Sequence, residues 1–299
     1  MSDGSVGRGV SAGSASARLR LALVGTGLIG GSLAAALRQG EEAPFITGFA
    51  PGNDAHRARE LGLIDQVCAS VAEAIAGADW VVLAAPVPAL PALFGEIAPV
   101  LAPHTRLTDC GSTKLSVIRA AREQLGPAFE RYVPGHPIAG SEHSGPDAAR
   151  PDLFRGRRWV LCPANEAQQM HSETLRALLA PTGAVVSQMS AEQHDRLFAE
   201  VSHWPHVVAF ALGAAIGRGD LADQAIEFSG GGLRDTSRIA ASSPELWAGI
   251  LLDNAEAVLA SGERYRRELD GLMHALAARD RETLLDVLER ASQWRRRLD

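Results

Sequence analysis

Residues 21–38 read LALVGTGLIGGSLAAALR, and this stretch decides the fold of the N-terminal half. A short apolar run leads into a glycine-rich turn, and leucines four positions apart then mark one face of a helix. The turn consists of Gly25, Thr26, Gly27, Leu28, Ile29 and Gly30. In this strand–turn–helix context a G-x-G-x-x-G pattern predicts dinucleotide binding: Gly25 permits the tight turn, Gly27 admits a pyrophosphate, and Gly30 lets the helix pack on the strand. The alternative is a glycine-rich turn of some other α/β protein.

The composition limits the classes of protein to which this chain can belong. The chain has 299 residues, 46% of them hydrophobic, with a net charge of -6 and a pI near 5.9. The acidic balance argues against nucleic acid as the main partner. No apolar run reaches the roughly 18 residues of a membrane helix. Three scattered cysteines fit a reducing compartment, so the expected location is the cytoplasm. Residues 1–18 are rich in Ser, Gly and Ala and predict a disordered tail, with a transit peptide as the weaker alternative.

Apolar and helical segments alternate from residue 19 to residue 189, which predicts an α/β fold with a Rossmann-like doubly wound sheet. Strands are expected at residues 21–24, 45–49, 80–85, 106–109, 132–133, 159–162 and 184–188. Helices are expected at residues 28–38, 55–61, 71–76, 89–101, 114–124 and 172–179. Residues 134–151 read as a long loop. This part is expected to be the dinucleotide-binding domain.

The choice of cofactor stays open. An NAD site usually has a carboxylate at the end of the second strand, but Ala50 stands there and Asp54 is the nearest acid. Arg57 and Arg59 are close enough in sequence to meet a 2′-phosphate. We expect NAD, with NADP possible. Further cofactor contacts are expected after the strands that follow, at Ala85, Pro86, Val87 and Gly111.

From residue 190 to residue 299 the pattern is all-α. Ser190 and Gln193 form a capping box, Pro205 predicts a kink, and Pro244 is expected to begin another helix. The apolar faces are too wide for these helices to bury alone, which predicts a homodimerisation domain. Examples of these apolar residues are Leu246, Ile250, Leu251, Val258 and Leu259.

Three polar clusters stand apart from the packing pattern: residues 109–114, 135–145 and 202–206. Ser112 in the first is explained equally well as the N-cap of the helix that follows. His136 in the second, taken alone, reads as a solvated loop histidine. His203 and His206 in the third share a helix face, but no further ligand has suitable spacing, so no metal site is expected.

These clusters together resemble the prephenate/arogenate (cyclohexadienyl) dehydrogenases of tyrosine biosynthesis. The matching segments are the glycine turn, residues 109–114, HPIAG at 136–140, SHWPH at 202–206, GGGLRD at 230–235 and TSRIA at 236–240. They fall in the order typical of that family and cover residues 21–299. The HPIAG, SHxPH and GGGxRD motifs are specific, whereas the glycine turn alone is not.

The resemblance implies roles for individual residues. His136 is the base that accepts the proton of the C4 hydroxyl, and Ser112 hydrogen-bonds and orients the same hydroxyl. Arg238 binds the ring carboxylate, for which its planar guanidinium is well suited. The remaining residues implied for the substrate pocket are His206, His203, Arg234, Trp247 and Glu142, and Arg234 is a candidate for the partner subunit's site.

Other functions remain as alternatives. The substrate could be arogenate, which has an amine where prephenate has a ketone. An imine or β-hydroxyacid reductase of similar plan would need a lysine on the helical half, and no lysine follows Lys114. A non-catalytic dinucleotide sensor would need none of His136, Ser112 and Arg238.

Overall fold

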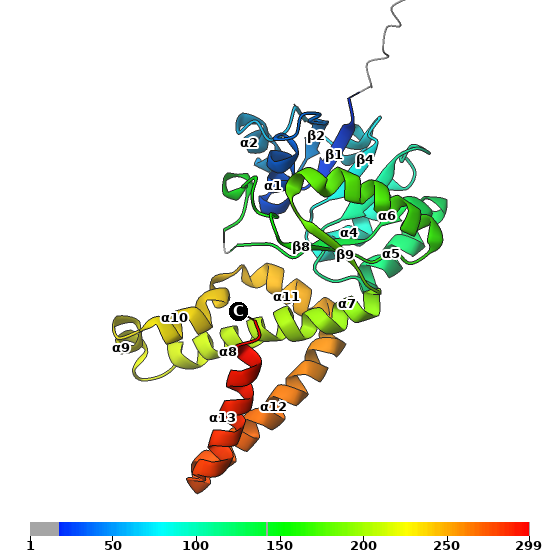
Figure 1. Cartoon of the computed structure of the whole chain (residues 1–299). Coiled ribbons are helices and arrows are strands. Elements are labelled where there is room, and N and C mark those ends of the chain that lie inside the picture. The colour runs from blue at the N-terminus through cyan, green and yellow to red at the C-terminus, as the bar shows by residue number, and fades with distance from the viewer. Residues whose placement is uncertain (1–17, 142, 299) are drawn as a thin grey trace, which may run out of the picture.

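The computed structural model describes residues 18–141 and 143–298, and its first part alternates strands and helices (Figure 1). The elements are β1 (Arg20–Val24), α1 (Leu28–Leu37), β2 (Phe45–Phe49), α2 (Asp54–Glu60), β3 (Gln66–Val67), α3 (Val71–Ile75), β4 (Trp80–Leu83), α4 (Leu90–Ile97), β5 (Arg106–Asp109), α5 (Leu115–Leu125), β6 (Tyr132–Val133), β7 (Gly135–Pro137), β8 (Arg158–Leu161), α6 (Glu166–Leu179) and β9 (Val185–Gln188). Six parallel strands form a sheet in the order β3-β2-β1-β4-β5-β6. The predicted fold class, a Rossmann-like sheet followed by helices, is confirmed.

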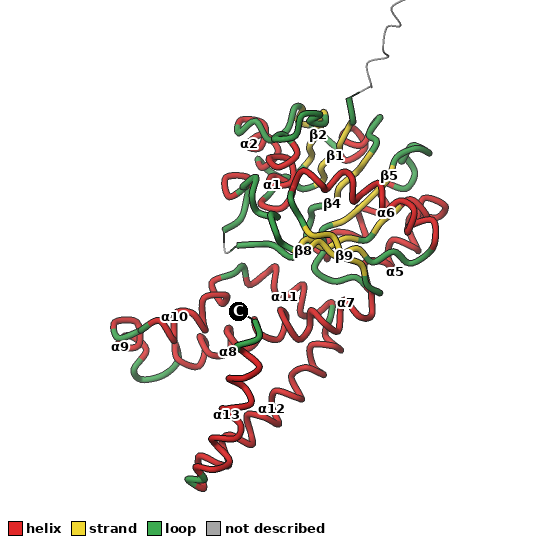
Figure 2. Tube along the Cα trace, viewed as in Figure 1, coloured by secondary structure: helices red, strands yellow, loops and turns green. Residues whose placement is uncertain are grey.

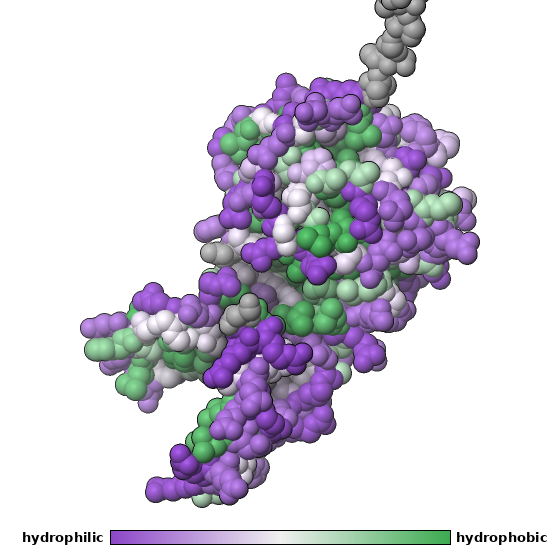
Figure 3. Space-filling view, in the orientation of Figure 1, coloured by the Kyte–Doolittle hydropathy of each residue, from purple (hydrophilic) through white to green (hydrophobic). Residues whose placement is uncertain are grey.

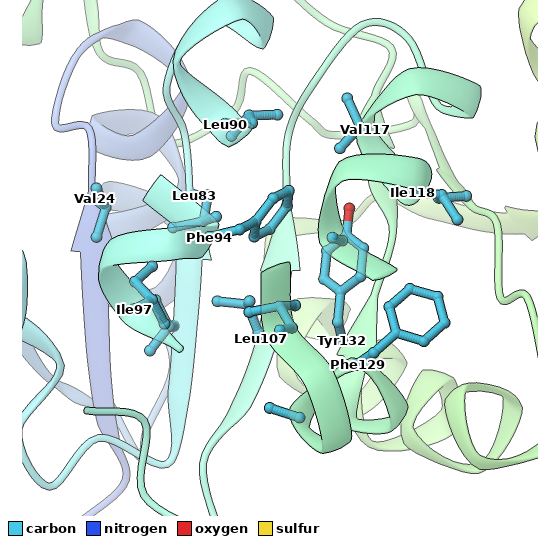
Figure 4. Packing of buried hydrophobic residues seen from close by; sticks show 14 of the residues in the cluster. Val24, Leu83, Leu90, Phe94, Ile97, Leu107, Val117, Ile118, Phe129 and Tyr132 are labelled. Atoms are coloured by element: carbon cyan, nitrogen blue, oxygen red, sulfur yellow. The ribbon is translucent and has the colours of Figure 1, made fainter. Parts of the chain in front are cut away.

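Both faces of this sheet are covered, which explains the nearly continuous apolar strands. Along β1 and β4, alternate side chains enter one of two cores. One core includes residues of α3, α4 and α5, and the other includes residues of α1, α2 and α6. In the first core, Phe94 of α4 meets Tyr132 of β6 edge-on, with ring centroids 5.3 Å apart (Figure 4). Tyr132 begins β6, and the first two polar clusters follow the ends of β5 and β6.

The last three strands do not extend the main sheet, contrary to the expectation of one sheet up to residue 189. They form a second sheet in the order β7-β8-β9, in which β7 runs antiparallel to β8. Figure 2 shows β8 and β9 of this sheet side by side. The chain changes sheets at Pro134, whose carbonyl accepts a hydrogen bond of 2.9 Å from the Cys162 amide. His136 therefore lies in a strand and not in a loop. A strand of three residues is too short to show the alternation by which strands are predicted.

Helices make up the second part of the chain. They are α7 (Ala191–Phe198), α8 (Trp204–Gly217), α9 (Ala222–Glu227), α10 (Gly231–Ser237), α11 (Pro244–Asp253), α12 (Ala255–Ala278) and α13 (Arg281–Arg295). The capping box at Ser190 and Gln193 is confirmed, as is the helix start at Pro244. A π-helical turn, Ala199–His203, joins α7 to α8 just before Pro205, where a kink was predicted. Such turns often mark functional sites.

The helical part exposes large apolar side chains. Figure 1 shows α12 and α13 as a hairpin that projects away from the sheets, and Figure 3 shows apolar surface on the arm that contains α9. The most exposed of these residues include Leu221, Ile226, Phe228, Leu252, Leu259, Leu288 and Trp294. Within residues 18–141 and 143–298, no helix combines the length and apolar character needed to cross a membrane.

Candidate active site

The glycine turn between β1 and α1 has the geometry of a dinucleotide site. Gly25 has a φ of +100°, and a Cβ on Gly25 or Gly30 would clash with backbone carbonyls. A Cβ on Gly27 would find its nearest neighbours 4.0 Å away, so the backbone is open to a ligand there. Helix α1 starts without a side-chain cap and without an acidic residue in its first turn. Its N–H groups and positive dipole end are therefore available to a pyrophosphate.

A second observation supports the fit of a dinucleotide. The hydroxyl of Thr26 is buried in this turn without a hydrogen-bond partner among the described residues. The other predicted cofactor residues lie at the same edge of the sheet: Ala50 follows β2, Asp54 begins α2, Ala85, Pro86 and Val87 follow β4, and Gly111 follows β5. The carboxyl ends of parallel strands are where such folds bind ligands.

Arg57, which could have met a 2′-phosphate, is held by carboxylates. Its Nε donates to Asp147 at 2.9 Å, its Nη2 donates to the same carboxylate at 2.6 Å, and its Nη1 donates to Glu60 at 2.9 Å. These contacts tie α2 to the segment that follows His136. In this arrangement the guanidinium is already occupied.

Ser112 does not cap the helix that follows it. Helix α5 begins at Leu115, and the carboxylate of Asp195 accepts hydrogen bonds of 2.8 Å from the amides of Lys114 and Leu115. The N-cap explanation of Ser112 is therefore wrong, because a residue of α7 satisfies these amides instead. Ser112 is half-buried in the loop after β5.

His136 begins a chain of buried hydrogen bonds. Its Nδ1 lies 2.8 Å from Nε2 of His194, whose Nδ1 lies 2.7 Å from Oδ1 of Asp195. His194 and Asp195 are both buried, and the ring of Phe198 packs against both imidazoles, with centroids 5.1 and 4.5 Å away. The described residues make no hydrogen bond to Nε2 of His136.

The environment sets the protonation states of this chain. Burial alone would raise the pKa of Asp195, but the hydrogen bonds from His194, Leu115 and Lys114 outweigh it and hold that pKa below its usual value. Burial, helped by the charges of His194, Lys114 and His203, lowers the pKa of His136 well below its usual value. The carboxylate is therefore charged and His136 neutral at pH 7.

The helical part supplies a second histidine pair. His206 donates through Nδ1 to the Ser202 carbonyl at 2.9 Å and stacks on Trp247, with ring centroids 3.4 Å apart. His203 is buried, and its Nδ1 accepts a hydrogen bond of 3.1 Å from the side-chain amide of Asn254. Burial lowers the pKa of His203 to about 4. Both imidazoles are therefore neutral hydrogen-bonding groups at pH 7.

Arg238 lies close enough to His206 to act on its charge. It begins a 3₁₀ turn, Arg238–Ala241, that packs on α8, and its charge, after burial, lowers the pKa of His206. Electrostatic interactions link His136 to His203, His203 to His206, and His206 to Arg238. His136 and Arg238 make no hydrogen bond or ring contact with each other among the described residues, and His203 and His206 are the groups that interact with both sides of the site.

Two predicted pocket residues are not among these interacting histidines and Arg238. Arg234 is exposed on α10, where its Nε donates to the Ser229 carbonyl at 3.3 Å. Glu142 lies outside the described residues. Among the described residues, no group of three or more His, Cys, Asp or Glu side chains could hold a metal ion.

Sequence reasoning missed His194, Asp195 and Asn254. Asn254 joins α11 to α12, and its amide also donates to the Asp195 carbonyl at 2.8 Å. One signal was available: His194 and Asp195 are adjacent polar residues on the face of α7 that also carries Phe198. Polar side chains on the buried face of an amphipathic helix need partners, and they often mark a functional site.

Comparisons with known proteins agree with this arrangement. The family model for the prephenate dehydrogenase nucleotide-binding domain matches residues 33–188, and the model for the prephenate dehydrogenase dimerization domain matches residues 190–290. A prephenate dehydrogenase of Bacillus subtilis is 35% identical over 276 residues, which cover 91% of this chain and 74% of the relative. A cyclohexadienyl dehydrogenase of Zymomonas mobilis is 33% identical over 92% of this chain and 94% of the relative.

Solved structures give the same result. Prephenate dehydrogenase from A. aeolicus in complex with hydroxyphenyl propionate and NAD+ superposes with a TM-score of 0.88 at 30% identity, over 95% of this chain and 100% of that chain. Synechocystis arogenate dehydrogenase superposes with a TM-score of 0.78 at 28% identity, over 94% of this chain and 100% of that chain. The glycine turn, the histidine series and these matches together show that the chain belongs to the prephenate dehydrogenase family.

Proposed function

We propose that this chain catalyses the NAD-dependent oxidative decarboxylation of prephenate to 4-hydroxyphenylpyruvate, a step of tyrosine biosynthesis. The observation that carries the proposal is the largely buried series His136–His194–Asp195, which begins in β7, directly after β6 of the main sheet, whose strand β1 leads into the glycine turn. A histidine whose protonation is controlled in this way is equipped to take a proton from an alcohol during oxidation.

The proposed reaction needs two things from the protein. Hydride leaves C4 of prephenate, the C4 hydroxyl gives up its proton, and the bond to the ring carboxylate then breaks to release CO2. The bonding electrons aromatise the ring, and the resulting phenolate oxygen takes the proton back. When bound, NAD supplies the nicotinamide that accepts the hydride. The chain's own residues must therefore hold the proton and orient the dianion.

The hydrogen bonds fix the tautomer of His136. Because the Asp195 carboxylate only accepts, His194 must carry its proton on Nδ1 and present a lone pair at Nε2. His136 then donates its Nδ1 proton to that lone pair. Its Nε2 is left with a free lone pair, which is the atom we assign to receive the C4 hydroxyl proton. The lowered pKa of His136 keeps this lone pair available at pH 7.

The other substrate contacts rest on the family resemblance and on position. Ser112, in the loop after β5, hydrogen-bonds the C4 hydroxyl, and Arg238 pairs with the ring carboxylate. His206, backed by Trp247, faces the pyruvyl side chain, with His203 behind it. Glu142 and Arg234 remain predicted pocket residues, with Arg234 a candidate for the partner subunit's site. The exposure of Arg234 in this chain is consistent with such a role.

We propose NAD as the cofactor, bound by the glycine turn and by residues after β2, β4 and β5. The A. aeolicus relative is described with NAD+, and here Arg57 is occupied by Asp147 and Glu60. Both observations favour NAD over NADP. We also propose that residues 19–189 form the dinucleotide-binding domain and residues 190–299 the domain that completes the substrate site.

We further propose a cytoplasmic homodimer formed through the helical part. The dimerization-domain match over residues 190–290 supports this, as do the exposed apolar residues of α12 and α13. Side chains such as Leu259 and Leu288, 67% and 56% exposed in the single chain, are of the kind that dimer interfaces bury.

The direct test is the formation of NADH from prephenate by the purified protein, measured by absorbance. Prephenate and arogenate should each be assayed with NAD and with NADP, because the Synechocystis neighbour is an arogenate dehydrogenase. We expect the highest kcat/KM with prephenate and NAD. For His136→Asn we expect kcat to fall by about 10²–10⁴ with the KM for NAD unchanged. Turnover of neither substrate by the wild-type protein would contradict the proposal.

A further inference from the structure

The carboxylate of Asp109, at the end of β5, is fully buried and accepts four hydrogen bonds. Its Oδ2 accepts from the Gly111 amide at 2.8 Å and from the Lys114 ammonium. Its Oδ1 accepts from the Tyr132 hydroxyl at 2.6 Å and from the Gly135 amide at 3.0 Å. Both oxygens are thus saturated, and the charge is balanced inside the protein.

Two of these donors lie directly beside the residues assigned to the chemistry. Gly111 precedes Ser112, and Gly135 precedes His136. One carboxylate therefore holds the backbone next to each of the two side chains that meet the C4 hydroxyl. Lys114 strengthens the same link, because its ammonium also donates to the Gly135 carbonyl at 2.8 Å.

Sheet pairing does not supply this alignment. Strand β5 pairs with β6 only through Leu107–Tyr132 and Thr108–Val133, and the chain then passes into the second sheet. The Ser112 loop and the His136 strand thus lie where one sheet ends and another begins. Among the described residues, the direct hydrogen bonds between these two segments run through Asp109 and Lys114, and an indirect path passes through His194 and Asp195 of α7.

The backbone at Gly111 and Gly135 packs too closely on Asp109 to admit a side chain. A Cβ on Gly111 would lie 2.9 Å from Oδ2 of Asp109, and a Cβ on Gly135 would lie 2.8 Å from the Asp109 carbonyl oxygen. Glycine at 135 therefore allows the two segments to approach this closely, and glycine at 111 allows its amide to reach the Asp109 carboxylate. A buried ion pair is by itself weak support for stability, since an apolar pair of similar volume often serves as well. The Asp109–Lys114 ion pair lies between the Ser112 loop and the His136 strand, so it can align these two segments as well as stabilise the fold.

We propose that Asp109 is a positioning residue whose carboxylate sets the spacing between Ser112 and His136. The proposal rests on the proposed function, because it takes those two side chains as the groups that meet the substrate hydroxyl. Asp109 does not touch the substrate. It acts through the amides of Gly111 and Gly135.

Two variants test the proposal, Asp109→Asn and Asp109→Glu. Either change disturbs the spacing, and a displacement of about 1 Å can cost on the order of 10²-fold in rate. We expect kcat with prephenate to fall by about that factor, with the KM for NAD close to wild type. The matched control is Asp79→Asn: its carboxylate accepts from the Arg20 amide at 2.8 Å, at the opposite end of the same sheet, and should leave kcat close to wild type.

The kinetic isotope effect separates positioning from a loss of folded protein. With prephenate that carries deuterium at C4, misalignment slows hydride transfer itself, so the isotope effect on kcat should rise in the Asp109 variants. A merely structural role would reduce the amount of folded enzyme and leave the isotope effect unchanged. Folding of each variant is checked by circular dichroism.

The outcomes are distinct. A folded Asp109 variant with wild-type kcat or with an unchanged isotope effect overturns the proposal. Failure of both variants to fold also overturns it, because the carboxylate would then serve the fold. A wild-type protein that does not oxidise prephenate contradicts the proposed function instead.

Discussion

Replacing Asp195 by Asn should weaken His136 as a base, although Asp195 makes no hydrogen bond to His136 in the described part of the chain. Oδ1 of Asp195 accepts from His194 Nδ1 and from the Lys114 amide, and Oδ2 accepts from the Leu115 amide. An asparagine oxygen in the place of Oδ1 keeps the first two of these bonds, and the NH₂ group then meets only the Leu115 amide. The reverse orientation would lose two bonds, so the first is favoured.

The tautomers of His194 and His136 are then kept, but the negative charge that stabilises a proton on this series is lost. A hydrogen bond to a charged group exceeds a neutral one by about 1–1.5 kcal/mol. We therefore expect His136 to become a weaker base and kcat to fall by about 10-fold. The loss of one charged acceptor should lower the free energy of unfolding by about 1–3 kcal/mol.

Steady-state NADH formation at saturating prephenate and NAD measures the effect, and urea unfolding measures the stability. The matched control is Glu192→Gln, a charge loss in the first turn of the same helix, where Glu192 is exposed and its side chain makes no hydrogen bond or ion pair within the described part of the chain. It should retain wild-type kcat. An Asp195→Asn enzyme that is folded and turns over at the wild-type rate would refute the role of the Asp195 charge in the basicity of His136.

Three further predictions follow from the site. Arg238→Gln should raise the KM for prephenate about 30-fold or more through loss of the carboxylate pair, and an unaltered KM in steady-state kinetics would place the carboxylate elsewhere. The lowered pKa of His203, about 4, means that the unfolded chain binds this proton first as the pH falls below about 6.5. The free energy of unfolding, measured by urea titration, should therefore fall by up to about 3 kcal/mol between pH 7 and pH 4. The fall should be smaller in His203→Gln, and equal falls in the two proteins would show that His203 is not its cause. Asp147→Ala releases Arg57 from its strongest partner, so the ratio of kcat/KM for NADP to that for NAD should rise, and an unchanged ratio would remove Arg57 from cofactor choice.

The sequence was most informative where one local pattern determines one local structure. The glycine turn, the apolar strands β1 and β4, and the capping box at Ser190 each depend on neighbours within a few residues, and each lies where it was predicted. The strand ends then bring Ala50, Ala85 and Gly111 to one edge, which follows from parallel pairing.

What the sequence could not show depends on contacts between distant residues. Helix α5 is capped by Asp195, 81 positions after Lys114, so the Ser112 N-cap was a reasonable local prediction that a distant side chain overrode. The second sheet joins β7 to β8 across the segment that includes Asp147, and three residues of strand give no periodic signal. His194 acquires its role only when α7 brings it 2.8 Å from His136.

The most direct test is a crystal structure of this protein with NAD+ and hydroxyphenyl propionate, the ligand pair described for the A. aeolicus relative. The decisive measurement is the distance from Nε2 of His136 to the phenolic oxygen of the ligand. We predict a hydrogen bond of about 2.6–3.2 Å, with Nδ1 of His136 still paired to His194. A phenolic oxygen out of hydrogen-bonding reach of His136, or an imidazole turned so that Nε2 faces His194, would contradict the assignment of His136 as the base.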